Sequence, residues 1–200
     1  MLVWVDCEMT GLDIGQDALI EVAVLVTDAD LNVQGDGVDI IIGTPPEAMA
    51  AMSDIVTDMH TKSGLLDEIA ASTVTMAEAE QRALDYVKMY VREAGKAPLA
   101  GNTIGTDRAF LARDMPAFES YMHYRNVDVS TIKELAKRWY PRVFYGAPEK
   151  KGHHRALSDI RESIQELRYF RAAVFVPRPG PSGDEVKNLA AAYPMEFLPA

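Results

Sequence analysis

Three strand-like segments at the start of this 200-residue chain constrain its fold more than any other feature. They span residues 2–8, 19–27 and 38–42, and they are apolar and separated by short polar turns. Connections of this length join antiparallel neighbours, whereas parallel strands need a longer crossover. The pattern therefore predicts an antiparallel meander.

The rest of the chain alternates between helical and strand-like patterns. Two short apolar segments, residues 97–100 and 127–129, are expected to add strands to the sheet. Helical spacing of apolar residues predicts helices at residues 65–69, 76–93, 107–115, 131–139 and 157–170. A meander followed by this alternation predicts an α/β domain over residues 1–176, with a mixed five-stranded sheet flanked by helices.

Residues 177–200 differ from the preceding domain in composition. Pro177, Pro179, Pro181 and the glycines between and after them should end the last helix and leave an extended tail. The pattern of residues 187–192 allows one further helical turn. It leaves open whether the tail packs on the body, contacts a partner or moves freely.

The composition indicates a cytoplasmic globular protein. A hydrophobic content of 48% supports a substantial core, and a single cysteine excludes an internal disulfide and fits a reducing compartment. No basic leader is expected, because strand-like sequence begins at Leu2. The most apolar segment, residues 19–26, contains Glu21 and is too short to cross a membrane.

The net charge of −10 is distributed unevenly along the chain. Residues 1–107 contain 5 basic and 19 acidic residues, whereas residues 108–171 contain 13 basic and 8 acidic ones. Long polyanions bind through many phosphate contacts, for which an acidic chain is poorly suited. A short oligonucleotide neutralised by metal fits better, although a solvated mixed surface accounts for most of these charges.

Four carboxylates and a histidine indicate a metal-dependent hydrolytic site. Asp6 and Glu8 end the first strand and share one of its faces, because side chains alternate along a strand. Asp107 and Asp159 fall at helix starts, and His154 precedes Asp159 by five residues. Taken singly, these acids are equally well explained as surface carboxylates or as acids favourable to a helix N-terminus. A histidine alone is more often a surface or capping residue than a catalytic one.

The combination is more informative, because four gathered carboxylates repel one another unless cations balance them. Hard oxygen donors suit Mg²⁺ or Mn²⁺, and a pair of such ions can hydrolyse a phosphodiester. On one helix His154 and Asp159 would lie about 140° apart. We therefore expect His154 in the loop before the last helix and Asp159 in its first turn.

Five separated motifs closely resemble the oligoribonuclease family, exonucleases with a DEDD acid set and a histidine five positions before the last Asp. The resemblance covers roughly residues 1–171 and is specific, because the motifs occur in the same order. It implies a ribonuclease H-like fold, a homodimer, and 3′-to-5′ removal of nucleoside 5′-monophosphates from very short RNA, dinucleotides included. The motifs are Asp6-Cys7-Glu8-Met9-Thr10-Gly11-Leu12, Gly101-Asn102-Thr103-Ile104-Gly105-Thr106-Asp107-Arg108, His123-Tyr124-Arg125, Asp128-Val129-Ser130-Thr131 and His154-Arg155-Ala156-Leu157-Ser158-Asp159-Ile160-Arg161-Glu162-Ser163.

The resemblance also implies a role for each site residue. Two Mg²⁺ or Mn²⁺ ions would be bound by Asp6, Glu8, Asp107 and Asp159. The general base would be His154, which the family spacing favours over the competing His153. The implied substrate contacts are made by Leu12, Thr103, Tyr124, Arg125 and Ser130.

Among these contacts, Leu12 would wedge against a base, and Tyr124 from the partner subunit would stack on one. Thr103, Arg125 and Ser130 would cap the 5′ phosphate, which would select short chains. The simpler explanations are a core or dimer aromatic for Tyr124 and a surface salt bridge for Arg125. One departure is Ile55, which stands where family members have a tryptophan in the base pocket.

Two other functions remain open from the sequence. A proofreading or tRNA-trimming exonuclease would use the same acids, but it would need an electropositive groove that suits an acidic chain poorly. A non-catalytic binding module would be expected to lack at least one of the acids or the histidine, and this chain retains all of them.

Overall fold

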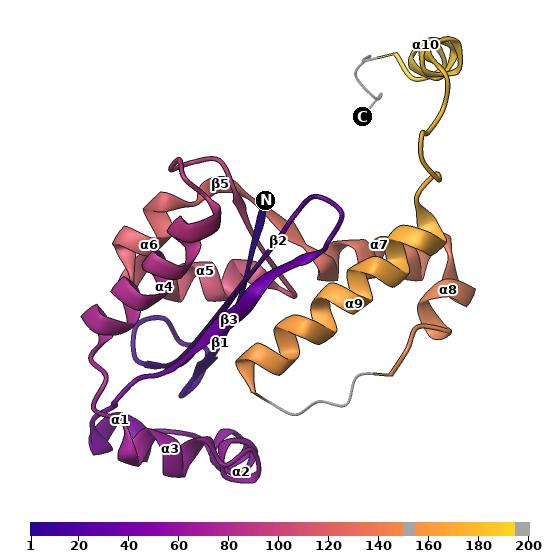
Figure 1. Ribbon diagram of the computed structural model, residues 1–200. Coiled ribbons are helices and arrows are strands. Elements are labelled where there is room, and N and C mark those ends of the chain that lie inside the picture. The colour runs from indigo at the N-terminus through magenta and orange to yellow at the C-terminus, as the bar shows by residue number, and fades with distance from the viewer. Residues whose placement is uncertain (150–154, 195–200) are drawn as a thin grey trace.

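The computed structural model describes residues 1–149 and 155–194. Its centre is a five-stranded mixed sheet in the order β3-β2-β1-β4-β5 (Figure 1). The first three strands pair antiparallel, and the last two add in parallel on the other side of β1. This confirms the predicted α/β class and the mixed sheet. The strands are β1 (Leu2–Met9), β2 (Leu19–Thr27), β3 (Val33–Ile41), β4 (Pro98–Gly101) and β5 (His123–Asp128).

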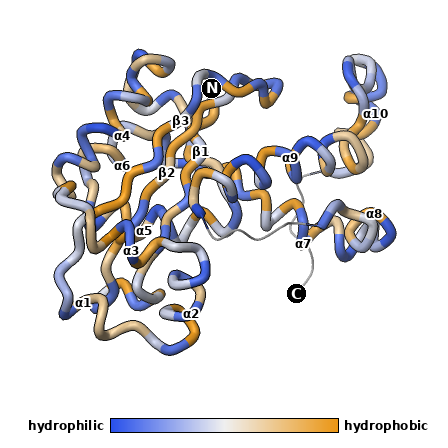
Figure 2. The backbone as a smooth tube through the Cα atoms, turned by 60° about the horizontal axis from the view of Figure 1, so that its bottom comes forward, coloured by the Kyte–Doolittle hydropathy of each residue, from blue (hydrophilic) through white to orange (hydrophobic). Residues whose placement is uncertain are grey.

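Helices cover both faces of the sheet (Figure 1). One face carries α4 (Met76–Tyr90), α5 (Ile104–Asp114) and α6 (Pro116–Tyr121), and the other carries α7 (Val129–Trp139) and α9 (Ala156–Val174). Figure 2 shows the hydrophobic stretches concentrated along β1 and β2, where the two faces are buried.

The alternation of β1 side chains decides which face carries the predicted acids. Val3, Val5 and Cys7 belong to the core under α4 and α5, whereas Trp4 belongs to the core under α9. Because Asp6 and Glu8 are two and four residues beyond Trp4, they share its face and point toward α9.

Several short elements were not predicted from sequence. The missed helices are α1 (Pro46–Ala50), α2 (Asp54–Lys62), α6 and α8 (Pro141–Tyr145); most have five or six residues, too few for a helical period to be seen. The short helix expected near Leu65 is α3 (Leu65–Ala71). Strand β3 begins at Val33 rather than at residue 38. Its first residues were not predicted as strand, because Gly35 and Gly37, both with positive φ, interrupt the apolar pattern there.

The tail extends away from the body and forms α10 (Gly183–Ala192) (Figure 1). This helix has no buried residue. Its exposure supports the predicted end of the domain at residue 176, which stays a prediction. Arg178 pairs with Asp30 of the body at 2.7 Å, but both side chains are largely exposed. Within residues 1–149 and 155–194, no helix has the length and apolar character needed for a bilayer crossing.

Removing residues 177–200 should change the free energy of unfolding by less than about 1 kcal/mol, because exposed ion pairs contribute roughly 0–1 kcal/mol. Urea unfolding of the truncated and full-length chains measures this difference. Phe170→Ala, which removes a fully buried ring of α9, should cost about 3–5 kcal/mol in the same assay. A loss of several kcal/mol on truncation would show instead that the tail belongs to the folded domain.

Candidate active site

Three carboxylates meet at the carboxyl end of β1. The ligand oxygens of Asp6, Glu8 and Asp159 all lie within 4.8 Å of one another. Asp159 is in the first turn of α9, as the sequence predicted. Ile160 and Ile164 pack that helix against the sheet, so the hydrophobic core fixes the third carboxylate over the other two.

Asp107 lies beside this group rather than within it. It is in the first turn of α5 and is only 7% exposed. The backbone N–H of Cys7 donates to Asp107 Oδ1 at 3.0 Å, which holds the carboxylate against β1. Among the neighbouring charges, that of Asp107 raises the pKa of Asp6 the most. The structure therefore gathers three of the four predicted acids and places the fourth next to them.

Burial and mutual repulsion make these acids difficult to ionise. Burial, followed by the charges of Asp107, Glu8 and Asp159, raises the pKa of Asp6 to about 9. Burial, followed by the charge of Glu21, raises the pKa of Glu8 to about 8. Burial also raises the pKa of Asp107 to about 6, although hydrogen bonds from backbone N–H groups oppose the shift.

Hard oxygen donors that repel one another in this way fit divalent cations well. A bound cation replaces the protons and favours the charged carboxylates. The residues present therefore fit a metal centre, with Asp6, Glu8 and Asp159 as its core and Asp107 adjoining.

A buried ion pair flanks the carboxylate cluster. Glu21 lies opposite Glu8 in the β1–β2 register, and its side chain is fully buried. Arg155 Nε lies 3.2 Å from Glu21 Oε1, and the same guanidinium contacts Glu68 of α3. Burial is the main cause that raises the pKa of Glu21 to about 7, and Arg155 opposes it. The sequence analysis missed this pair, although Glu21 is the one charged residue in the apolar segment 19–26.

His60 of α2 is a second residue near the cluster to which the sequence analysis gave no role. Its side chain is fully buried, with Nε2 3.0 Å from the Met9 carbonyl and Nδ1 4.0 Å from Glu8 Oε2. These contacts attach α2 to the end of β1. Ile55, near the start of the same helix, is 82% exposed and free to face a ligand.

The loop after β1 presents Leu12, which is 76% exposed. The backbone N–H of Asp13 donates to Asp17 Oδ2 at 2.8 Å and so closes the loop. Gly11 permits this closure, because a Cβ at that position would lie 2.3 Å from Asp17 Oδ2. The fixed loop and the exposed side chain suit the predicted base contact of Leu12.

Thr103 and Ser130 lie together where α5 and α7 begin. Their hydroxyl oxygens are 3.1 Å apart, and the backbone N–H groups of both donate to Asp128 Oδ1. Thr103 has a φ of 55°, in the left-handed region that few non-glycine residues adopt. Because the Asp128 carboxylate already accepts from both N–H groups, the polar groups left for a ligand here are the two hydroxyls.

Tyr124 and Arg125 lie on the edge strand β5. Tyr124 is 73% exposed, so it is not a core aromatic of this chain. Its ring stacks on His123 with centroids 4.5 Å apart, and the Arg125 guanidinium carbon is 5.4 Å from the ring centroid. An aromatic presented in this way is suited to a ligand or to a second protomer.

His154, the predicted general base, lies outside the described residues, as does His153. The described chain resumes at Arg155, the N-cap residue of α9. The first-turn position of Asp159 is thus confirmed, whereas the position of His154 stays a prediction.

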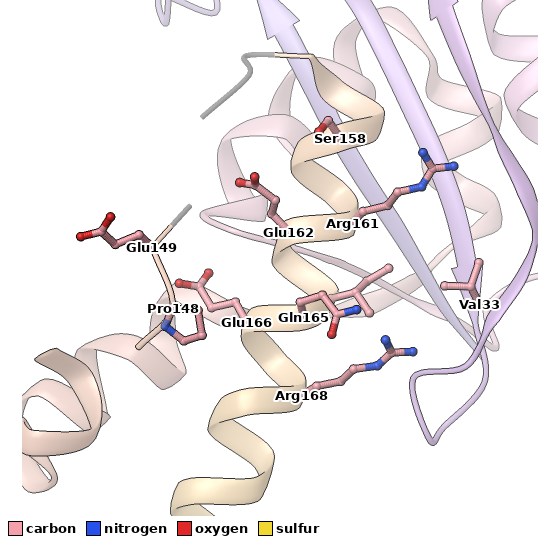
Figure 3. Close-up of a pocket in the computed structure, with 10 residues that line it drawn as sticks. Val33, Pro148, Glu149, Ser158, Arg161, Glu162, Gln165, Glu166 and Arg168 are labelled. Atoms are coloured by element: carbon pink, nitrogen blue, oxygen red, sulfur yellow. The ribbon is translucent and has the colours of Figure 1, made fainter. Parts of the chain in front are cut away.

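A cavity of about 430 Å³ lies along α9, between this helix, Val33 and Pro148 (Figure 3). Its described lining residues include none of the four acids. Two of the lining residues are arginines that donate to backbone carbonyls: Arg161 to Asp36 of β3, and Arg168 to Leu31 of the turn between β2 and β3. These hydrogen bonds hold β3 and the turn before it against α9.

The metal-free protein should lose free energy of unfolding as the pH rises from about 4 to about 9. Folded Asp6 and Glu8, with pKa values of about 9 and about 8, retain protons that the unfolded chain releases near pH 4. Urea unfolding in a chelator across this range measures the trend, which Asp6→Asn should flatten. Saturating Mn²⁺ should reverse it, since metal competes with protons. A metal-free stability that rose with pH would contradict the crowding of these acids.

Comparisons with known proteins show the family to which the chain belongs. The exonuclease family profile matches residues 3–167. The oligoribonuclease of Streptomyces avermitilis is 62% identical over 199 residues, covering 100% of this chain and 98% of its own. That of Cutibacterium acnes is 63% identical over 193 residues, covering 96% and 95%.

Among solved structures, exonuclease I from Methylocaldum szegediense superposes with a TM-score of 0.59 at 20% identity, over 96% of this chain and 42% of that one. This chain thus spans less than half of that structure, and the similarity confirms the ribonuclease H-like fold. The two sequence relatives match 100% and 96% of the chain. The chain therefore belongs to the exonuclease family and, within it, to the oligoribonucleases.

Proposed function

We propose that this protein removes nucleoside 5′-monophosphates from the 3′ end of very short oligoribonucleotides, dinucleotides included. The observation that carries the proposal is the meeting of Asp6, Glu8 and Asp159 in a chain with oligoribonuclease motifs. The exposed Leu12 and the Thr103–Ser130 pair support a small nucleic-acid substrate. The single cysteine supports a cytoplasmic location.

Each member of the cluster has a defined role in this proposal. Asp6, Glu8, Asp107 and Asp159 hold two Mg²⁺ or Mn²⁺ ions, which when bound lower the pKa of a water and stabilise the leaving oxygen. His154 in its neutral form accepts a proton from the attacking water.

Substrate length is selected by contacts at the two ends of a short chain. Thr103, Ser130 and Arg125 cap the 5′ phosphate, and Leu12 and the partner subunit's Tyr124 contact the bases. Any base can stack on an aromatic face, so these contacts carry little sequence preference. Because Ile55 supplies no aromatic wall, Leu12 and Tyr124 make more of the base contact here.

Asp159→Asn and His154→Ala should each reduce turnover of a dinucleotide by at least about 100-fold. His154→Ala removes the general base, which contributes roughly 10²–10⁴-fold, and Asp159→Asn removes a charged ligand of the metal ions. Circular dichroism should show an intact fold in both variants. Asp184→Ala, an exposed acid of α10, is the matched control and should retain normal turnover. Near-normal turnover by either site variant with Mg²⁺ or Mn²⁺ would show that the roles are wrongly assigned.

Cleavage of labelled RNA from two to about seven nucleotides should be fastest for the shortest chains, because a phosphate cap rewards a nearby 5′ end. Arg125→Ala should weaken this preference by raising KM for the dinucleotide. Arg142→Ala, an exposed arginine of α8, should leave it unchanged. A preference for long DNA would indicate a proofreading or trimming exonuclease instead.

A mixing experiment tests whether Tyr124 acts in the partner's site. Tyr124→Ala should reduce turnover, because base–aromatic stacking contributes about 1–3 kcal/mol. Tyr145→Ala, a similarly exposed tyrosine of α8, should not. Mixing equal amounts of the Tyr124→Ala and Asp159→Asn proteins should restore activity toward about one quarter of wild type, since about half of the dimers are then heterodimers and each of these has one intact site of two. No recovery after confirmed subunit exchange would contradict the shared site.

A further inference from the structure

We infer that Arg155 is a positioning residue for the metal centre, which fixes the first turn of α9, and hence Asp159, through Glu21 and Glu68. The inference deepens the proposed function and rests on it. None of these three residues was given a catalytic or binding role above.

The guanidinium of Arg155 joins four elements. Glu21 of β2 lies 3.2 Å from Nε, and Glu68 of α3 accepts hydrogen bonds from both terminal nitrogens. Asp39 of β3 is 3.9 Å from Nη2. The Arg155 side chain is 26% exposed and that of Glu21 is fully buried, so their interaction is poorly screened by water. A planar fork that contacts two carboxylates at once also fixes orientation.

The same contacts supply the N-terminal cap of α9. Arg155 is the N-cap residue and makes no capping hydrogen bond with its own side chain. Glu21 takes this part, because its Oε2 lies 3.5 Å from the backbone nitrogen of Ala156 at the start of the helix. A carboxylate at this position also complements the helix dipole.

Fixing the helix start fixes the metal ligand that follows it. Asp159 lies three residues after Ala156, within the first turn, so it moves with the start of α9. Glu21 lies opposite Glu8 in the sheet but is not a member of the described carboxylate cluster. Its buried carboxylate therefore positions the site rather than binding the metal.

The test compares variants of the full-length protein by steady-state kinetics on a dinucleotide and by Mn²⁺ calorimetry. Arg155→Lys keeps the charge but loses the fork, and should lower kcat and Mn²⁺ affinity by about 10-fold with little change in KM. Arg155→Gln should lower kcat by about 100-fold. Glu68→Gln should act in the same direction as Arg155→Lys, and the double variant Glu68→Gln with Arg155→Gln should be no worse than Arg155→Gln alone.

Arg171→Gln is the matched control, because it removes a surface ion pair at the other end of α9 and should leave kcat and Mn²⁺ affinity unchanged. A purely structural role would lower the melting temperature without weakening Mn²⁺ binding to folded protein. That result, or an Arg155→Lys protein with wild-type kcat, would overturn the inference. If wild type cleaves no oligonucleotide, the proposed function fails, but the Mn²⁺ affinities still test the positioning role.

Discussion

Repulsion among carboxylates at the end of β1 is the constraint on which the site depends. Asp6, Glu8 and Asp159 lie within 4.8 Å of one another, and Asp107 adjoins them. Burial makes each negative charge costly, so the cluster persists only because the surrounding core fixes the positions of the acids. A site that is costly without cations is, for the same reason, favourable to them.

Two different parts of the fold meet this constraint. The alternation along β1 sends Asp6 and Glu8 toward α9, while Cys7 on the opposite face belongs to the other core. Helix α9 then brings Asp159 across, with its start anchored by Arg155 and Glu21. The ionic anchor lies at the helix end nearest the carboxylate cluster, whereas apolar packing holds the rest of the helix.

Much of this arrangement could be predicted from sequence, and the failures have physical causes. The apolar runs of β1 and β2 and the placement of Asp159 in a first turn followed from local periodicity and spacing. The roles of Glu21 and His60 did not, because a buried charge or imidazole is recognised only by what it contacts. Those contacts come from Arg155 and Met9, which lie 134 and 51 residues away in the chain.

The most direct test of the central claim is anomalous diffraction from crystals soaked in Mn²⁺. We predict two manganese peaks about 3.5–4 Å apart, the separation typical of two-metal sites. Both should lie among the carboxylate oxygens of Asp6, Glu8 and Asp159, with Asp107 alongside. Manganese bound elsewhere, or the absence of manganese from this cluster at saturating concentration, would contradict the account.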